Sequence, residues 1–499
     1  MHTLKYISIG GIWLLLLSCA PARAQQPADS TPDQQPGQQA SQPIPAIRSP
    51  LASAADNGDQ DEAPNPQELQ PDTRALTGVE DLSLGTLALE HSYWQPRLAL
   101  SEAVDSNPAS SAAGNGSWGT WTSLLGGVDI HRISGVSDLL VSYTGGDMFS
   151  TGNSSASNGV IQELNFKDKF LFRRSILSVF DQVSYLPESS FGFAGTAGAT
   201  LPGVGNGVGL GSGFTPGQSI LTPEGQNLSN AFDVELDTKL TPRTSLTLVG
   251  GYSLLHYFDD KLSNFGDATF QAGYNYQLTR KDTIAVSYNF SAFRYSNVDQ
   301  SLNLNTVQGS YARRITGKLA FQISAGPQFA SSTFPITSST TSTASGTTST
   351  SQLYWTLNTA LQYQLRHSAI NASYNHGVTG GSGVLAGAET DVVTGGFNSQ
   401  VSRTFNAGFT AGYSRNKGFS PTSGSSGASG TSDAQSFSYW FAGVNVAHPI
   451  GRSLDIFANY QLQYQNSSTN GCVGSACSTN ITRHQIMFGL NLHKQPIPF

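Results

Sequence analysis

The stretch from Ala268 to Tyr295 reads ATFQAGYNYQLTRKDTIAVSYNFSAFRY, and it decides the fold. Apolar and polar residues alternate on both sides of a short polar turn, Arg280-Lys281-Asp282. This period of two, sustained over about ten residues, predicts two strands that each have one apolar and one polar face. A bilayer is crossed by about 9–11 residues of a tilted strand. We therefore interpret the hairpin as two strands of a transmembrane β-barrel, with lipid outside and water inside.

The polar face of this hairpin distinguishes it from a soluble sheet. It carries Asn, Gln, Ser, Thr and Gly rather than Lys and Glu. The apolar face is made of Phe270, Ala272, Tyr274, Tyr276, Leu278, Ile284, Val286, Tyr288, Phe290 and Ala292. A soluble sandwich would have shorter strands and would bury that face against a second sheet.

The composition fits one large barrel. The chain has 499 residues, of which 38% are hydrophobic and 12% are charged, whereas soluble domains usually carry about 25% charged residues. It has no run of 18 apolar residues, so a transmembrane helix is not expected. The net charge of −7 and the pI near 5.7 argue against nucleic acid as a partner.

The N-terminus has the pattern of a secretory signal peptide over residues 1–24. Lys5 gives the positive start, Ile7 to Leu17 form the apolar core, and an A-x-A sequence ending at Ala24 predicts the cleavage site. In the alternative interpretation, Cys19 is the acylated cysteine of a lipoprotein signal. Both alternatives stay open.

Two further segments precede the barrel. Residues 25–75 are rich in Gln, Pro, Ala and Asp and almost free of aromatic residues. Such a segment cannot bury enough apolar surface to fold, so we predict a disordered periplasmic linker. Residues 76–92 are assigned as a short connecting segment, and residues 93–499 as the barrel.

Short connections alternate along the chain with long connections rich in Gly, Ser and Thr. The short ones carry basic residues, at Arg132, Arg173, Arg243, Lys281, Arg313, Arg366, Arg403 and Arg452. The long ones run near 105–117, 149–158, 187–228, 259–266, 296–302, 335–352, 378–390, 419–435 and 467–480. This alternation is typical of outer-membrane barrels. It predicts an all-β, antiparallel up-and-down barrel of about 18 strands, with 16 as the alternative, whose first strand runs from Tyr93 to Val104.

The C-terminal strand, from His484 to His493, is also amphipathic, and the chain stops at Phe499. This resembles the C-terminal signal of bacterial outer-membrane barrels, a final strand ending in an aromatic residue that the barrel assembly machinery reads. Pro496 and Pro498 depart from that pattern, because they place Phe499 beyond the strand. Over roughly 90–499, the chain resembles porin-like barrels of Gram-negative bacteria. The resemblance implies an outer-membrane location, outer-membrane lipid as a neighbour, a channel, and a trimer as one oligomeric state.

Catalytic and cofactor motifs are not evident. The sequence contains no H-E-x-x-H, P-loop or G-x-S-x-G pattern. The glycine run from Gly203 to Gly213 lacks the strand and helix that a nucleotide-binding loop requires. His256, Asp259 and Asp260 lie together at one strand end, but this grouping is too common to indicate a hydrolase. We therefore predict no enzyme activity, no cofactor and no metal.

Cys472 and Cys477 lie in one predicted loop, GCVGSAC. A pair of cysteines in a secreted chain favours a disulfide. A metal site is the weaker alternative, because neither a histidine nor a second cysteine pair accompanies them.

Charged residues interrupt the neutral polar face on three strands. These pore-lining candidates are Asp233, Glu235, Asp237 and Lys239, then Glu163, Lys167 and Lys169, and finally Asp455. Two interpretations stay open: the charges set ion and solute selectivity in a constriction, or they form salt bridges that brace the wall. Asp168 and Asp181 fall on the apolar face of their strands, and the parity of Phe437 to Val446 is ambiguous.

The remaining predicted lumen carries neutral amides and hydroxyls, which suits small polar solutes. The sequence thus predicts a porin-like channel for passive diffusion or export of such solutes. The alternative is a closed structural or surface-interaction barrel with binding loops. Whether the 187–228 loop closes the pore is left open.

Overall fold

The described part of the chain begins just before the predicted first strand. The computed structural model describes residues 92–107, 118–150, 158–186, 226–258, 262–296, 300–336, 346–381, 385–402, 404–418, 436–467 and 480–499. The predicted signal peptide and linker, nearly all of the connecting segment, most of the 187–228 loop and both Cys472 and Cys477 lie outside these residues.

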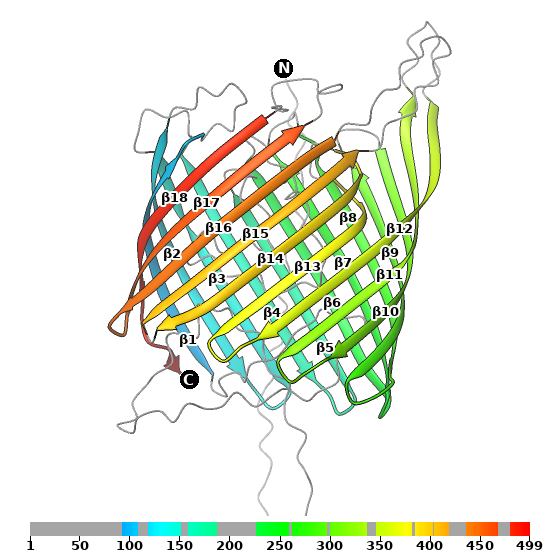
Figure 1. The fold of residues 1–499 in the computed structure, drawn as a ribbon, viewed down its shortest axis with the longest axis horizontal. Coiled ribbons are helices and arrows are strands. Elements are labelled where there is room, and N and C mark those ends of the chain that lie inside the picture. The colour runs from blue at the N-terminus through cyan, green and yellow to red at the C-terminus, as the bar shows by residue number, and fades with distance from the viewer. Residues whose placement is uncertain are drawn as a thin grey trace, which may run out of the picture. The chain divides into compact units, whose positions relative to one another are not determined.

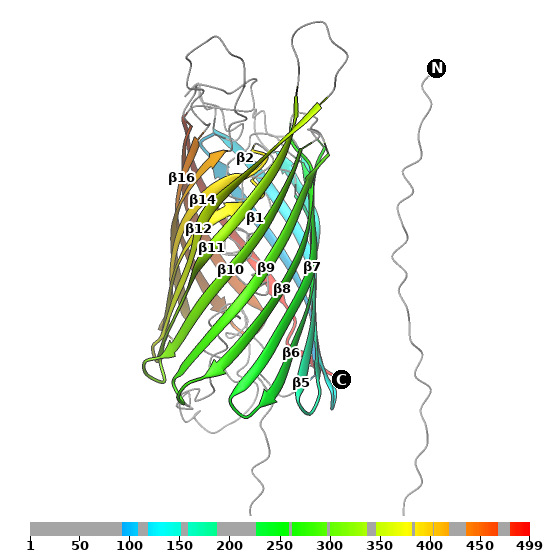
Figure 2. The same ribbon diagram turned by 90° about the vertical axis from the view of Figure 1, so that its right-hand side faces the viewer.

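The described residues form eighteen long strands and one short one, each antiparallel to its neighbours (Figures 1 and 2). The strands are β1 Tyr93–Asp105, β2 Gly119–Ile133, β3 Ser137–Ser150, β4 Gly159–Leu171, β5 Ser175–Leu186, β6 Asn227–Thr241, β7 Thr244–Tyr257, β8 Phe265–Gln277, β9 Asp282–Tyr295, β10 Gln300–Arg314, β11 Leu319–Ile336, β12 Gly346–Gln364, β13 Ser368–Thr379, β14 Ala388–Ser402, β15 Phe405–Gly418, β16 Ser436–Ile450, β17 Leu454–Ser467, β18 Asn480–His493 and β19 Ile497–Pro498. Each of β1 to β17 pairs with the next strand, and β18 pairs with β1, so the sheet closes on itself. The predicted 18-strand barrel is confirmed. The part of the chain that is described holds no helix long and apolar enough to cross a membrane.

The hairpin formed by β8 and β9 has one outward and one inward face, as its alternating sequence predicted. On β8 and β9, Phe270 is 47% exposed and Val286 is 61% exposed on the outer surface. Asn275 and Ser287, one residue away from outward-facing neighbours, are buried on the inner side. Because successive side chains of a strand point to opposite faces, the same rule assigns every strand an outer and an inner row.

The barrel closes between the first and last strands. β1 and β18 pair from Arg97 opposite His493 to Asp105 opposite Gln485. After β18 the chain bends, and the two residues of β19 pair with the first two residues of β1. The terminal Phe499 thus lies beyond the last long strand, as Pro496 and Pro498 predicted.

Eight of the strand pairs are joined by short turns, which define the short-turn end of the barrel. At the long-loop end, the strands extend further than the sequence indicated. The predicted bounds of the loop near 335–352 were wrong, because β11 and β12 continue their ladder up to Ile336 opposite Gly346. Their Ser and Thr residues looked like loop composition, but Thr also favours strands, and Ser332 and Thr350 share a hydrogen bond of 2.9 Å. This hairpin rises past its neighbours in Figure 1.

The ambiguous parities are resolved by the strand pairing. Phe437, Tyr439 and Phe441 of β16 face inward and are buried, whereas Trp440 is 54% exposed on the outer surface. Asp181 shares the outer row of its strand, as the alternation indicated, and accepts a hydrogen bond of 2.7 Å from Asn230 of the next strand.

Candidate functional site: the inner wall of the barrel

Charged side chains occupy one arc of the inner wall. By strand alternation, the inward acidic, basic and histidine side chains of the described strands lie on β17, β18, β1 to β4, β6 and β8. They are Arg97, Asp105, Asp129, His131, Asp138, Glu163, Lys167, Lys169, Asp233, Glu235, Asp237, Lys239, Asp267, Asp455, Arg483 and His493. On β9 to β16, the described inner row is neutral except for Arg314, which lies at the short-turn end. The inner wall is therefore electrostatically two-sided.

Arg97 on β1 makes polar contacts with side chains on β2 and β3. Its Nη2 donates to Thr144 Oγ1 at 2.6 Å and to Ser142 Oγ at 3.1 Å, and its Nη1 lies 3.4 Å from Asp129 Oδ2. Gly127 leaves room for this side chain, because a Cβ there would lie 2.6 Å from Arg97 Nε. Arg97 was not among the predicted pore-lining residues, and its partners come from two other strands.

The predicted charges on β4 face inward. Glu163 is 5% exposed and accepts a hydrogen bond of 3.0 Å from Asn165 Nδ2. The Nζ of Lys167 lies 4.7 Å from the centroid of the Phe180 ring on β5, a cation–π contact. Lys169 shares the inner row nearer the short-turn end.

The acidic row on β6 also follows the prediction. Asp233, Glu235, Asp237 and Lys239 share one face, with Lys239 exposed near the short turn. Thr247 Oγ1 donates to Asp237 Oδ1 at 2.6 Å. These positions are as expected, while the selectivity role of the row stays a prediction.

Asp267 on β8 is an inward carboxylate that the sequence analysis did not select. It is 7% exposed. The predicted strand begins at Ala268, one residue later, and the predicted loop before it covers 259–266. Extending the same alternation by one residue places Asp267 in the inner row with Thr269.

Two buried or partly buried ion pairs involve β17 and β18. Arg483 Nε donates to Asp105 Oδ2 across the seam, with both side chains almost completely buried. At the short-turn end, the predicted lumenal residue Asp455 lies 3.3 Å from His493 Nε2. Residues of β18 thus meet carboxylates on both of its neighbours.

The connection between β13 and β14 turns toward the inner wall at the long-loop end. Tyr295 and Gln300, which face inward from β9 and β10, donate hydrogen bonds to the carbonyls of Gly380 and Ala386, the second at 2.7 Å. Leu385 packs with inward-facing Phe437. We call residues 380–381 and 385–387 the tip. Gly381 and Gly387 have φ of 79° and 89°, which favour glycine.

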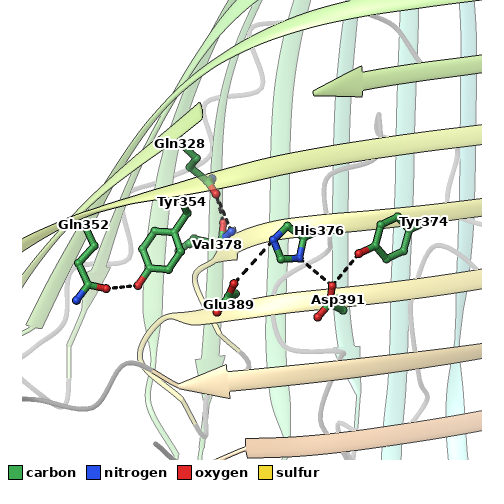
Figure 3. A network of polar contacts seen from close by, with 8 residues as sticks. All are labelled: Gln328, Gln352, Tyr354, Tyr374, His376, Val378, Glu389 and Asp391. Carbon is green, nitrogen blue, oxygen red and sulfur yellow. Dashed lines mark hydrogen bonds and ion pairs between the residues drawn. The ribbon is translucent and has the colours of Figure 1, made fainter. Parts of the chain in front are cut away.

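A side chain replaces part of the ladder beside the tip. The pairing of β12 with β13 stops at Leu357 opposite His376. Farther along, Gln328 of β11 reaches the backbone of Val378: its Oε1 accepts from the Val378 N–H at 2.7 Å, and its Nε2 donates to the carbonyl at 3.3 Å (Figure 3). This amide satisfies backbone groups that the neighbouring strand leaves open.

A cluster of polar side chains lies nearby on the outer row of β13 and β14 (Figure 3). Asp391 Oδ1 lies 2.8 Å from His376 Nδ1 and accepts a hydrogen bond of 2.9 Å from Tyr374 OH. Glu389 Oε1 lies 3.8 Å from His376 Nε2. The Trp355 ring stacks on the imidazole, with centroids 3.9 Å apart. Among the described residues, no group of three or more His, Cys, Asp or Glu is arranged to hold a metal ion.

Apolar clusters add to the neutral polar lumen that the sequence predicted. One contains the inward residues Trp121, Leu125 and Ile161 on β2 and β4. Another gathers Leu255, Phe265 and Leu302, together with Val378 beside the tip. The inner wall therefore combines a charged arc, a neutral polar arc and apolar patches.

Comparison with known proteins gave no matching family model and no matching curated protein. Solved structures with a similar trace include Pseudomonas aeruginosa OpdQ, at 12% identity and a TM-score of 0.39, covering 82% of this chain and 100% of that one. Acinetobacter baumannii OccAB3 is 10% identical, with a TM-score of 0.38, and the match covers 81% of this chain and 100% of that one. The outer membrane protein opdK from Pseudomonas aeruginosa is 9% identical, with a TM-score of 0.37, and the match covers 80% of this chain and 99% of that one.

The geometry itself defines the class. A closed antiparallel barrel of eighteen described strands, with an apolar outer surface and a largely polar inner wall, is a porin-like outer-membrane β-barrel. In such barrels the short turns are periplasmic and the long loops extracellular. The charged seam near Asp105 and the tip lie at the long-loop end of the barrel, and Asp455 lies at the short-turn end.

Proposed function

We propose that this protein is an outer-membrane channel through which small polar solutes diffuse, in uptake or in export. The observation that carries the proposal is the two-sided inner wall of an 18-strand barrel. A barrel of 16–18 strands is wide enough for an aqueous lumen. Neutral amides and hydroxyls on β9 to β16 can exchange hydrogen bonds with a polar solute, while the charged arc orients its dipole or charge.

The acidic residues favour cations over anions in this channel. Carboxylates outnumber ammonium and guanidinium groups along the inner row, and three of them, Asp233, Glu235 and Asp237, succeed one another on β6. Arg97 and Arg483 both have carboxylate partners, which reduces the positive potential that they project. A row of like charges in a low-dielectric wall concentrates counter-ions.

The tip contributes to selection by size. It is held to the inner wall by Tyr295 and Gln300, on the side where solutes enter from outside. A segment docked inside a barrel mouth narrows it. We therefore place the extracellular constriction beside the tip.

Conductance in planar bilayers tests the channel directly. Purified full-length protein should insert and produce discrete current steps that favour cations at low salt. Membranes that stay silent after insertion, verified by a heat-modifiable band on a detergent gel, would overturn the channel. They would favour a closed structural or surface-interaction barrel, whose supporting observation is the apolar cluster around Trp121, Leu125 and Ile161 inside the wall.

A further inference from the structure

Asp267 has a buried carboxylate oxygen that no donor satisfies. The side chain is 7% exposed, its Oδ1 is fully buried, and no hydrogen-bond partner for that atom occurs in the described part of the chain. The backbone N–H of Ala292 on β9 favours the ionised form of this carboxylate. A buried charge that is incompletely bonded is costly, so such an atom calls for an explanation, such as an ion.

The neighbours of Asp267 increase this cost. Phe265 lies two residues before it in the same inner row, and Tyr295 and Leu255 belong to the same apolar cluster. Among the described residues, the charged group whose field acts on Asp267 is a second carboxylate, Asp233. Apolar surroundings and a like charge both disfavour an ionised carboxylate unless a positive charge joins them.

A glycine brings the second carboxylate close. Asp233 is paired with Gly251 on β7, which has no side chain. Asp233 Oδ1 lies only 1.9 Å from where a Cβ of Gly251 would be, and Thr269 Oγ1 of β8 lies 2.8 Å from the same point. The carboxylate therefore lies across β7, close to β8. Thr269 and Asp267 are same-face neighbours on β8, about 7 Å apart along the strand.

We propose that Asp267 and Asp233 hold a cation on the extracellular side of the lumen, with Thr269 Oγ1 as a further oxygen ligand. Two carboxylates and a hydroxyl are the oxygen ligands that a hard ion such as Ca²⁺ takes, with water completing its shell. The same oxygens also accept the N–H donors of an ammonium group on a solute. The shared chemistry is a compact positive charge between two carboxylates. If the bound charge is the ammonium group of a solute, the site rests on the proposed channel function. If it is an inorganic ion, the site does not depend on that function.

Calorimetric titration of the full-length protein in detergent with CaCl₂, and separately with methylammonium chloride, tests the site. We expect wild-type protein to bind one of these cations with a single site per chain. Asp267→Asn and Asp233→Asn should each weaken binding by at least about tenfold. The matched control is Asp455→Asn, which removes an inward carboxylate of the periplasmic end and should bind like wild type. Heat-modifiable migration of each variant verifies folding.

Gly251→Ala provides a second variant that keeps every carboxylate. A Cβ at this position would displace the Asp233 carboxylate, so binding should weaken while both charges remain. Binding of Ca²⁺ alone identifies an inorganic ion, and binding of methylammonium alone identifies the solute group. Absence of binding for both cations overturns the site, as does binding that neither Asp267→Asn nor Asp233→Asn weakens. Since titration needs no ion flow, a protein that binds but does not conduct keeps the site and loses the channel.

Discussion

Arg483 of β18 and Asp105 of β1 form a buried ion pair across the seam that closes the barrel, with exposed side-chain fractions of 2% and 0%. Asp105 also accepts a hydrogen bond of 2.7 Å from the backbone N–H of Asn107 through its other oxygen. The two residues are 378 positions apart. Their contact therefore exists only once the first and last strands have met.

Breaking this pair should destabilise the barrel. Arg483→Gln leaves the Asp105 carboxylate buried without its guanidinium, and removal of one partner of a buried pair costs about 3–5 kcal/mol. We expect urea unfolding of the variant in detergent, followed by tryptophan fluorescence, to show a lower midpoint. The control is Arg313→Gln, whose side chain is half exposed and 3.6 Å from Asp282; its midpoint should stay near that of wild type. Equal midpoints for both variants would show that the seam pair adds no stability.

The strand architecture could be predicted because it depends on local pattern. Alternation identifies the inner and outer rows, and it located the charges on β4 and β6 without knowledge of any partner. Contacts across strands could not be predicted in the same way. Arg97 and Arg483 reach partners whose proximity depends on register and closure, which a period of two does not specify.

The contacts that hold the tip could not be predicted from local sequence either. The connection near residues 378–390 was predicted as one of the long loops rich in Gly, Ser and Thr, and nothing local indicates that Tyr295 and Gln300, about 85 residues earlier, hold it. Asp267 was missed for a simpler reason, since the predicted strand began at Ala268, whereas β8 begins at Phe265. The contacts of the tip are tertiary and could not be predicted from local sequence, whereas the inward position of Asp267 could have been.

Loosening the tip should enlarge the conducting pathway. Tyr295→Phe removes the hydroxyl that donates to Gly380, and Gln328→Met removes both hydrogen bonds to the Val378 backbone. Each lost hydrogen bond weakens docking by about 1 kcal/mol, roughly a fivefold change in a docked-to-undocked ratio. Single-channel recordings of the double variant should show larger or more frequent open levels.

The control for the tip is Tyr288→Phe, which removes a hydroxyl bonded to Asn305 on the outer row of the neighbouring strands. It changes the same chemistry without touching the lumen, so its current steps should match those of wild type. If the double variant also matches wild type, the tip does not limit conduction.

The Cys472–Cys477 disulfide stays a prediction, since both residues lie outside the described part of the chain. Mass spectrometry of protein from the outer membrane under non-reducing conditions should find the pair bonded. The closed loop is short, so reduction should lower stability by about 2 kcal/mol or less. Two free thiols would contradict the prediction.

The acidic row on β6 should set the ion preference of the channel. The variant with Asp233→Asn, Glu235→Gln and Asp237→Asn keeps the shapes of the side chains and removes three negative charges from the inner wall. We expect a lower cation-to-anion permeability ratio, obtained from the reversal potential under a KCl gradient. The difference should be largest at low salt, because screening shortens to about 3 Å at 1 M.

Asp181→Asn is the matched control for that row. Asp181 lies on the preceding strand, β5, but faces outward, where it meets Asn230 rather than the lumen. It removes a carboxylate from the same region of the chain, so it tests whether charge must face the lumen to act on permeating ions. Its reversal potential should equal that of wild type. If the triple variant keeps the wild-type reversal potential at low salt, the acidic row braces the wall and does not select ions; if Asp181→Asn shifts it as strongly, the inner-row assignment of selectivity fails.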